Sequence, residues 1–261
     1  MLSKSQKVIV EFNKISKSFG NRQVLKDITL KINSGQSICI IGTSGCGKSV
    51  TLKCLLGLIK PDSGSIKVNG KETTNQSRKQ REEMLKLFGM TFQFGALFDS
   101  LPIWENITFR LRQNTNISKS IARTKATKIV KQLGLDKSVI DQYPAELSGG
   151  MQKRVALARA IVDEPRILLF DEPTSGLDPI TGGVIDNLIK DSVKRLGATA
   201  ITISHDMSSV KRIADHVAMI HYGKIIWDGK VSDMNKTKIP EVHQFINGLS
   251  EGPLTNGYDN N

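Results

Sequence analysis

Gly42-Thr43-Ser44-Gly45-Cys46-Gly47-Lys48-Ser49 is the stretch that decides the fold. It follows the pattern G-x-x-x-x-G-K-[ST], in which glycines let the backbone turn tightly and bring its N–H groups close to an anion. The apolar run 37–41 precedes it and the run 50–56 follows it. A buried strand, this loop and a helix, in that order, form a phosphate-binding loop. A glycine-rich turn with an exposed lysine is the alternative, and it leaves the flanking strand and helix unexplained. The stretch therefore predicts nucleoside triphosphate binding.

The polar groups of this phosphate loop (residues 42–49) have separate expected tasks. The N-terminus of the following helix carries roughly half a positive charge, which adds to the backbone N–H groups as an anion site. We expect Lys48 to reach the β- and γ-phosphates and the Ser49 hydroxyl to ligate Mg²⁺. The residues expected to contact the nucleotide are Gly42, Thr43, Ser44, Gly45, Cys46, Gly47, Lys48, Ser49 and Val50.

Cys46 allows two interpretations. It lies beside Lys48 at a helix N-terminus, a position that lowers a thiol pKa. In that case thiol reagents should inactivate the protein and ATP should protect it. The alternative is an inert loop residue. The three cysteines of the chain (Cys39, Cys46 and Cys54) form no disulfide framework, so a reducing cytosol fits best.

The composition is that of an ordinary globular protein. A chain of 261 residues with 39% hydrophobic and 24% charged residues can bury one sizeable core. No apolar run approaches the roughly 20 residues that span a bilayer, and residues 1–7 contain no apolar segment of a secretory signal.

The net charge of +12 has three interpretations. A solvated helix face comes first and an anionic membrane surface second. Nucleic acid comes a distant third, and we expect no nucleic-acid partner, because no aromatic residues alternate with the basic ones. The basic residues form only a loose cluster: Lys119, Arg123, Lys125, Lys128, Lys131 and Lys137.

Short apolar runs between turn residues predict the remaining elements. Strands are expected at 8–12, 28–32, 37–41, 65–68, 87–92, 166–170, 200–204, 216–220 and 224–227. Helices are expected after the phosphate loop, within 73–86, and at 181–195, 207–214 and 242–246. Between 94 and 163 apolar residues recur at helical spacing. We therefore expect an α/β fold with an inserted helical subdomain at about 94–163, within a domain of residues 1–239, followed by a C-terminal extension, 240–261.

Asp171 and Glu172 follow a continuously apolar strand, at the end where ligands gather in parallel sheets. An aspartate there can hold Mg²⁺, usually through water. The neighbouring glutamate points elsewhere and can orient an attacking water as a general base. Alone the pair could equally be a plain turn, but together with the phosphate loop it indicates triphosphate hydrolysis.

Leu147-Ser148-Gly149-Gly150-Met151-Gln152, the signature segment, is a second anion-binding device. Ser148 is placed to cap a helix, and two glycines expose backbone N–H groups. One nucleotide has one triphosphate, so two phosphate cradles with a single acidic pair suggest sharing between two chains.

These residues resemble the ordered motifs of ABC transporter ATPase subunits. The resemblance rests on the phosphate loop, Gln93, the signature segment, Ile167-Leu168-Leu169-Phe170-Asp171-Glu172-Pro173, Ser175-Gly176-Leu177-Asp178 and Ser204-His205-Asp206. It covers residues 8–229. Met151 departs from the usual signature, but the residues that would face phosphate are in place.

The resemblance implies a P-loop NTPase (RecA-like) core with an antiparallel β subdomain and an inserted α-helical subdomain. It also implies a head-to-tail homodimer with ATP between one chain's phosphate loop and the other's signature. Phe19 would stack on adenine. Gln93 would join Ser49 and water-linked Asp171 around Mg²⁺, and the catalytic set would be Glu172, His205, Gln93 and Lys48. Ser148, Gly149 and Gly150 would serve the partner's nucleotide, and Asp178 would align the two sites.

A narrower resemblance concerns the cargo. The segment 92–101, Asp178-Pro179-Ile180-Thr181 and the ending 242–248 are similar to lipid-transport ATPases of the Mla type, which work with MCE-domain proteins. It implies phospholipid transport, a peripheral place on the cytoplasmic face of the inner membrane, a permease bound through an apolar groove at Gln93–Leu101, an MCE protein and a small accessory subunit. A buried loop is the alternative for 95–101, and exposed Leu97 and Phe98 would favour the groove. An amino acid or drug cargo, a non-transport relative acting on DNA or ribosomes, and a binding module without turnover stay open.

Overall fold

The computed structural model describes residues 7–93 and 95–255, and within them the chain forms two compact units. The first, called unit 1, combines the chain up to Leu85 with the chain from Ile203 onward. The second, called unit 2, runs from Lys86 to Thr202. Each unit is described by itself. Phe94, in the expected permease groove, lies outside the described residues.

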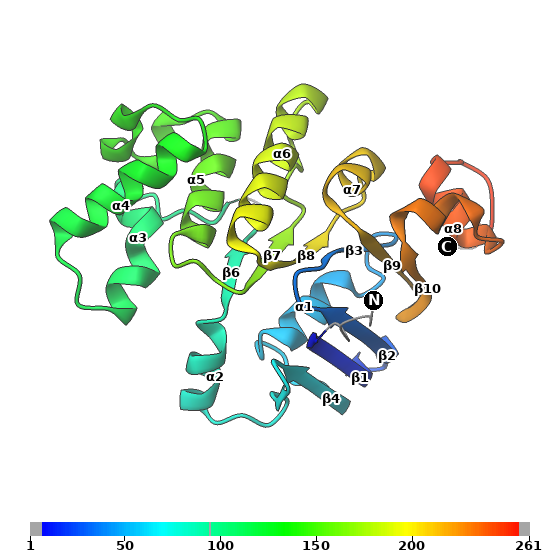
Figure 1. Ribbon diagram of the computed structural model, residues 1–261. Helices are drawn as coiled ribbons and strands as arrows, with labels where there is room; N and C mark the ends of the chain where they lie inside the picture. The colour runs from blue at the N-terminus through cyan, green and yellow to red at the C-terminus, as the bar shows by residue number, and fades with distance from the viewer. Residues whose placement is uncertain (1–6, 94, 256–261) are drawn as a thin grey trace, which may run out of the picture. The chain divides into compact units, whose positions relative to one another are not determined.

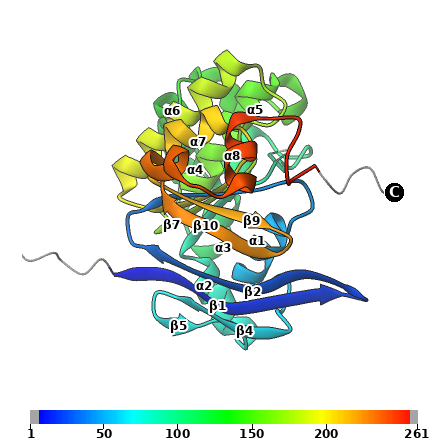
Figure 2. The ribbon, with the colours of Figure 1, turned by 90° about the vertical axis from the view of Figure 1, so that its right-hand side faces the viewer.

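Unit 1 contains a four-stranded antiparallel sheet in the order β2-β1-β4-β5, visible side-on in Figure 2. Its strands are β1 (Val8–Phe19), β2 (Arg22–Asn33), β4 (Ser63–Val68) and β5 (Lys71–Glu72). β1 and β2 are much longer than the expected strands 8–12 and 28–32. Lys14 and Asp27 have positive φ angles of 50° and 55°, and the β1–β2 register shifts between Phe12 and Lys17. These bulges interrupt the alternation of apolar and polar residues from which a strand is recognised.

The rest of unit 1 contains the strand and the helix that flank the phosphate loop, together with their neighbours (Figure 1). β3 (Ser37–Ile41) pairs in parallel with β9 (His216–His221), and β9 pairs antiparallel with β10 (Lys224–Lys230). The expected hairpin through Tyr222-Gly223 is therefore confirmed. The helices of the unit are α1 (Lys48–Leu55), α2 (Arg78–Leu85), α7 (Met207–Ile213) and α8 (Pro240–Asn247), with a short 3-10 helix η3 (Val231–Lys236).

Unit 2 consists of neighbouring strands and a group of helices. Its strands lie in the order β8-β7-β6: β8 (Thr199–Ile203), β7 (Ile167–Asp171) and β6 (Phe88–Thr91). β6 and β7 are parallel, with Met90 opposite Leu169. The helices are α3 (Ile103–Asn114), α4 (Lys119–Gln132), α5 (Gly149–Ile161) and α6 (Pro179–Leu196), with 3-10 helices η1 (Lys137–Asp141) and η2 (Pro144–Glu146).

Each unit has its own apolar core. In unit 2 one cluster joins helices α3 to α6 and strand β7, with Ile107, Val130, Leu157 and Phe170 almost completely buried. In unit 1 a cluster around Cys39, Ile41, Val217, Met219 and Val242 holds α8 against β9 and β3. Burial of apolar side chains stabilises these clusters, and the strands in them carry the polar residues described next at their ends.

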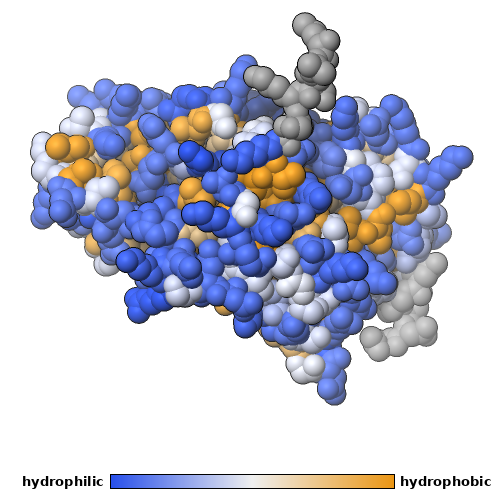
Figure 3. Space-filling model, turned by 60° about the horizontal axis from the view of Figure 1, so that its bottom comes forward, coloured by the Kyte–Doolittle hydropathy of each residue, from blue (hydrophilic) through white to orange (hydrophobic). Residues whose placement is uncertain are grey.

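No helix within residues 7–93 and 95–255 is both long enough and apolar enough to cross a membrane. Figure 3 shows a face on which hydrophilic side chains predominate and apolar side chains gather in separate patches.

Candidate functional site

The phosphate loop connects the buried strand β3 to α1 and exposes backbone donors at the start of the helix. α1 has Gly47 at its N-cap, with no side-chain hydrogen bond capping the helix and no acidic residue in its first turn. The N–H groups of the first turn are therefore available to an anion, and the helix dipole adds to their attraction.

Two glycines of the loop lie where a side chain would not fit. A Cβ on Gly42 would lie 2.1 Å from the carbonyl oxygen of Ile220, at the end of β9. A Cβ on Gly47 would lie 2.6 Å from Leu25 Cδ2. Both residues also have positive φ angles, 143° and 112°, which favour glycine. The tight loop therefore depends on glycine for its backbone angles and for its close packing against β9 and β2.

Lys48 folds back over the loop. Its Nζ donates hydrogen bonds to the carbonyl oxygens of Gly42, at 2.7 Å, and Thr43, at 2.9 Å. The ammonium is thus held inside the cup formed by the loop. Ser49, which follows it in the first turn of α1, is exposed.

Cys46 corrects one expectation. Its side chain is 7% exposed, and burial raises the pKa of the thiol, with the positive charge of Lys48 opposing this effect only in part. The lowered pKa expected from its place at a helix N-terminus is therefore wrong. Packing of the loop against the rest of unit 1 removes the thiol from water, and desolvation penalises the thiolate more than Lys48 stabilises it.

A large polar cavity in unit 1 lies beside the phosphate loop. It is lined by Thr43, Ser44, Gly45 and Cys46 of the loop, by Arg22, Gln23, Val24 and Lys26 of β2, and by His221, Tyr222, Gly223 and Leu254. Phe19, at the end of β1 where the chain turns toward Arg22, is 47% exposed and has the Lys17 ammonium 5.6 Å from its ring centre. An exposed ring at this edge of the sheet can stack on a nucleobase.

His205 lies in unit 1 at the carboxyl end of β8. The N–H of the preceding residue, Ser204, donates to the carbonyl oxygen of Ile40 in β3 at 3.4 Å, which brings this segment beside the strand that leads into the phosphate loop. His205 is exposed, and Asp206 caps α7 by accepting from the N–H of Ser208 at 2.8 Å.

In unit 2 the acidic pair ends strand β7 as expected. Asp171 is the last residue of β7, and Glu172 follows it with a φ of 47°, in the left-handed region that non-glycine residues rarely adopt. The turn it makes continues to Ser175, whose N–H donates to the Glu172 carbonyl oxygen at 3.2 Å. The backbone thus turns sharply between two adjacent carboxylates, and such strain is a frequent mark of a functional site.

Gln93 follows β6 and is tied to this turn. Its Nε2 donates to Ser175 Oγ at 3.4 Å, and its backbone carbonyl accepts from Lys153 Nζ of α5. Burial lowers the pKa of Lys153, while the negative charge of Glu172 opposes that shift. Lys153 is therefore part of the same network as Gln93 and Glu172.

The signature segment forms the exposed start of α5. Ser148 is its N-cap, with Oγ accepting from the N–H of Met151 at 3.3 Å, and both Ser148 and Gly149 are exposed. A Cβ on Gly150 would lie 3.0 Å from Thr181 Cγ2 in α6. Gln152 Nε2 donates to the carbonyl oxygens of Pro144, at 2.9 Å, and Leu147, at 3.2 Å, and so fixes the chain that leads into the helix.

Asp178 is the N-cap of α6. Its carboxylate accepts from the N–H groups of Ile180 and Thr181, both at 3.0 Å. The side-chain and backbone hydrogen bonds from Thr181 hold the pKa of this carboxyl below its usual value. In a single chain, Asp178 therefore acts as a helix cap.

The structure groups the expected site residues by unit. Unit 1 holds the phosphate loop, Phe19 and His205, and unit 2 holds Gln93, Asp171, Glu172, Asp178 and the signature segment. Lys153 was not predicted as a site residue. The sequence shows a lysine on the signature helix, but it does not show that this lysine contacts Gln93, which is 60 positions away.

The family of the chain follows from comparison with known proteins. The model of the ABC transporter family matches residues 25–175, which include the phosphate loop, the signature segment and the acidic pair. This match covers more than half of the chain.

Curated relatives match almost the whole chain. Protein TRIGALACTOSYLDIACYLGLYCEROL 3, chloroplastic, of Arabidopsis thaliana is 37% identical over 97% of this chain and 77% of its own length. The probable ribonucleotide transport ATP-binding protein mkl of Mycobacterium tuberculosis is 37% identical, over 95% of this chain and 68% of its own. The intermembrane phospholipid transport system ATP-binding protein MlaF of Escherichia coli is 36% identical, over 94% of this chain and 91% of its own.

Solved structures give the same result. The dimeric post-hydrolysis state of an ATP-binding cassette with ADP and phosphate has a TM-score of 0.79 and 28% identity, covering 85% of this chain and 99% of that one. CbiO1 of Clostridium perfringens has a TM-score of 0.80 and 29% identity, covering 94% and 96%. The expected P-loop NTPase fold is thereby confirmed. The chain belongs to the ABC transporter family, as an ATP-binding subunit that hydrolyses ATP.

Proposed function

We propose that two copies of this chain, arranged head to tail, hydrolyse ATP to drive phospholipid transport through a separate permease. One observation carries the dimer: α1 follows Gly47 and α5 begins at Gly149, so both helices present glycine-rich N-termini that suit a phosphate group. The start of α5 would serve the triphosphate held by the phosphate loop of the partner copy. The ATP-binding cassette with ADP and phosphate, to which this chain is similar, is a dimer.

The residues take distinct roles in this proposal. The phosphate loop with Val50 and Lys48 holds the triphosphate, and Phe19 stacks on adenine. Glu172 orients the attacking water and His205 contacts the γ-phosphate. Ser148, Gly149 and Gly150 act on the nucleotide of the partner copy, and Asp178 aligns the two sites.

Mg²⁺ fits the donors that the chain provides. Ser49, Gln93 and Asp171 offer a hydroxyl, an amide and a carboxylate oxygen, and hard oxygen donors are what this ion prefers. Within residues 7–93 and 95–255, no group of three or more His, Cys, Asp and Glu residues could hold a metal. When bound, the ion would neutralise developing charge on the phosphate oxygens.

The segment 93–101 is the proposed permease site. Phe98 is 42% exposed, and its ring lies 4.6 Å from that of Phe109. Leu97 is less exposed, because it is partly buried against the core of unit 2. An exposed aromatic residue on a fixed loop suits an apolar helix of a partner.

The proposed cargo is supported by the name of a relative. Phospholipid is named for the relative that the chain matches over 91% of its length. We propose the same cargo, an MCE-domain protein and a small accessory subunit as partners, and a peripheral place on the cytoplasmic face of the inner membrane. A ribonucleotide cargo is the second candidate, because the mycobacterial relative carries that name. We also propose an ATPase domain of residues 1–239, including a helical subdomain at about 94–163, with 240–261 as an extension.

One experiment separates these cargoes. The tagged chain is isolated from membranes with its complex, the other subunits and the bound small molecules are identified by mass spectrometry, and ATPase activity is measured with added phospholipid or ribonucleotide. The proposal expects a permease, an MCE protein, co-purified phospholipid and stimulation by phospholipid. Stimulation by ribonucleotides alone, without bound lipid, would overturn it.

A further inference from the structure

Helix α5 directs two cations at one short stretch of main chain. Lys153 Nζ donates to the carbonyl oxygen of Gln93. Two turns further along the helix, Arg159 donates to the carbonyl oxygens of Gly95, at 2.6 Å, and Ala96, at 2.7 Å. Helix α5, which begins in the signature segment, therefore holds the segment after β6 by hydrogen bonds.

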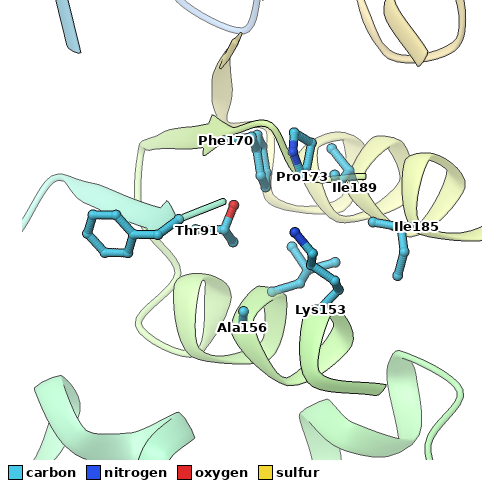
Figure 4. A pocket seen from close by; sticks show the side chains of 9 residues that line it. Thr91, Lys153, Ala156, Phe170, Pro173, Ile185 and Ile189 are labelled. Carbon is cyan, nitrogen blue, oxygen red and sulfur yellow. The ribbon is translucent and has the colours of Figure 1, made fainter. Parts of the chain in front are cut away.

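Lys153 occupies an unusual place for an ammonium group. It lines a small, mainly apolar cavity with Phe92, Ala156, Leu157, Phe170, Pro173, Ile185 and Ile189. Figure 4 shows its nitrogen pointing from α5 into this space, toward the turn at Pro173. The hydroxyl of Thr91 is buried in the same wall and has no hydrogen-bond partner among the described residues.

Burial of a cation in such surroundings is unfavourable unless charges or hydrogen bonds offset it. Burial lowers the pKa of Lys153 and the negative charge of Glu172 opposes this shift, so the carboxylate offsets part of the cost of burying the ammonium group. A methionine or leucine would fill the space at lower cost. The presence of lysine therefore calls for a role of the charge itself.

Gln93 and Glu172, the two residues that interact with Lys153, belong to the expected reaction centre. Gln93 is tied to Ser175 in the turn that begins at Glu172, through the 3.4 Å hydrogen bond between Nε2 and Oγ. Lys153 adds a second connection between the same two segments, from the main chain of Gln93 to the charge of Glu172.

We propose that Lys153 is a positioning residue for ATP hydrolysis: its ammonium group fixes the Gln93 main chain and the Glu172 carboxylate relative to each other, and connects both to the signature helix. The inference rests on the proposed roles of Gln93 at Mg²⁺ and Glu172 at water. Any movement of the start of α5 then reaches the metal ligand and the base of the same chain together.

The test compares substitutions at position 153 in the purified full-length protein. Lys153→Met should lower kcat about 10- to 100-fold, as is typical for loss of a group that orients a reacting one. KM for ATP should change less than about twofold, because the phosphate loop is untouched. The Mg²⁺ concentration for half-maximal activity should rise. Lys153→Arg, which keeps the charge, should restore most of kcat.

Three further variants make the result decisive. Lys131→Met removes an exposed lysine of α4 and should leave kcat, KM and the unfolding temperature unchanged. Arg159→Met loosens the same loop without removing the charge beside Glu172, so it should lower kcat less than Lys153→Met does. Lys153→Gln keeps a donor for the Gln93 carbonyl but no charge, and serves in its place if Lys153→Met does not fold.

Wild-type kcat in Lys153→Met or Lys153→Gln would overturn the inference. So would equal losses of kcat in Lys153→Met and Arg159→Met, since the lysine would then only pack the loop. If instead the wild-type protein and Lys131→Met hydrolyse no ATP, the proposed function fails, independently of Lys153.

Discussion

The buried carboxamide of Asn106 holds Phe98 by both of its backbone groups. Asn106 Oδ1 accepts from the Phe98 N–H at 2.7 Å, and Nδ2 donates to the Phe98 carbonyl oxygen at 3.0 Å. Nδ2 also donates to the Leu101 carbonyl oxygen at 2.8 Å. One side chain of α3 thus adds to the backbone hydrogen bond from the Leu101 N–H to the Phe98 carbonyl oxygen, and it holds the segment that carries the exposed Phe98 ring.

Asn106→Ala should therefore disconnect the permease from the ATPase. The substitution removes the Asn106 partner of the Phe98 N–H and of the Leu101 carbonyl oxygen, which costs about 1–3 kcal/mol of unfolding free energy. ATP turnover of the isolated subunit should stay within about threefold of wild type. Recovery of the permease with the tagged subunit should fall at least several-fold. Asn114→Ala, at an exposed position of the same helix, is the control, and undiminished permease recovery in Asn106→Ala would contradict the proposed docking segment.

Glu172→Gln tests the proposed general base. Since the amide cannot accept the proton of the attacking water, turnover should fall by about 10²- to 10⁴-fold. ATP binding should persist, so the variant should accumulate as an ATP-bound dimer, measured by light scattering with and without Mg²⁺ and ATP. Glu164→Gln is a matched control, because Glu164 is exposed and has a similar φ of 50°. Wild-type turnover in Glu172→Gln would show that another group activates water.

Gly42→Ala tests the close packing of the phosphate loop. A methyl group there would lie 2.1 Å from the Ile220 carbonyl oxygen, so the loop or the end of β9 must move. We expect ATP binding, measured by calorimetry, to be lost, together with about 1–3 kcal/mol of stability. Gly70→Ala shares the positive φ but has nothing within 4 Å of its Cβ, so it should retain ATP binding. If both variants bind ATP equally well, close packing does not shape the loop.

Cys54 should make the protein less stable at alkaline pH. Burial raises the pKa of its thiol from an ordinary value of 9.0 to about 11. Because the unfolded state loses this proton more readily, the contribution is fully present below pH 9 and is lost as the pH rises toward 11. The difference in unfolding free energy between wild type and Cys54→Ala should shrink by about 2 kcal/mol over this range. Denaturant titrations at pH 8, 9, 10 and 11 measure it, and a constant difference would contradict the raised pKa.

Local patterns were sufficient for the parts of the site that are continuous in sequence. The phosphate loop between β3 and α1, and Asp171 at the end of β7, follow from apolar runs, glycines and the residues just after them. The β9–β10 hairpin follows likewise from Tyr222-Gly223. In each case residues close together in the sequence determine the structure, and local sequence patterns predict such structure well.

Properties that depend on packing were not accessible in this way. The pKa of Cys46 is set by burial in unit 1, which outweighs the neighbouring Lys48. Lys153 meets Gln93 only because α5 packs on β6. The full lengths of β1 and β2 were hidden by the bulges at Lys14 and Asp27, where the alternating pattern breaks although Ile15 and Leu25 remain buried.

The left-handed backbone at Glu172 has a consequence for how this chain can evolve. Glycine is the residue that would relax the turn after β7, by about 1 kcal/mol or more, but it has no carboxylate. Selection for a more durable fold and selection for reaction chemistry therefore oppose each other at this one position. A programme of thermostabilisation that replaces residues of positive φ by glycine would delete the proposed base along with the others.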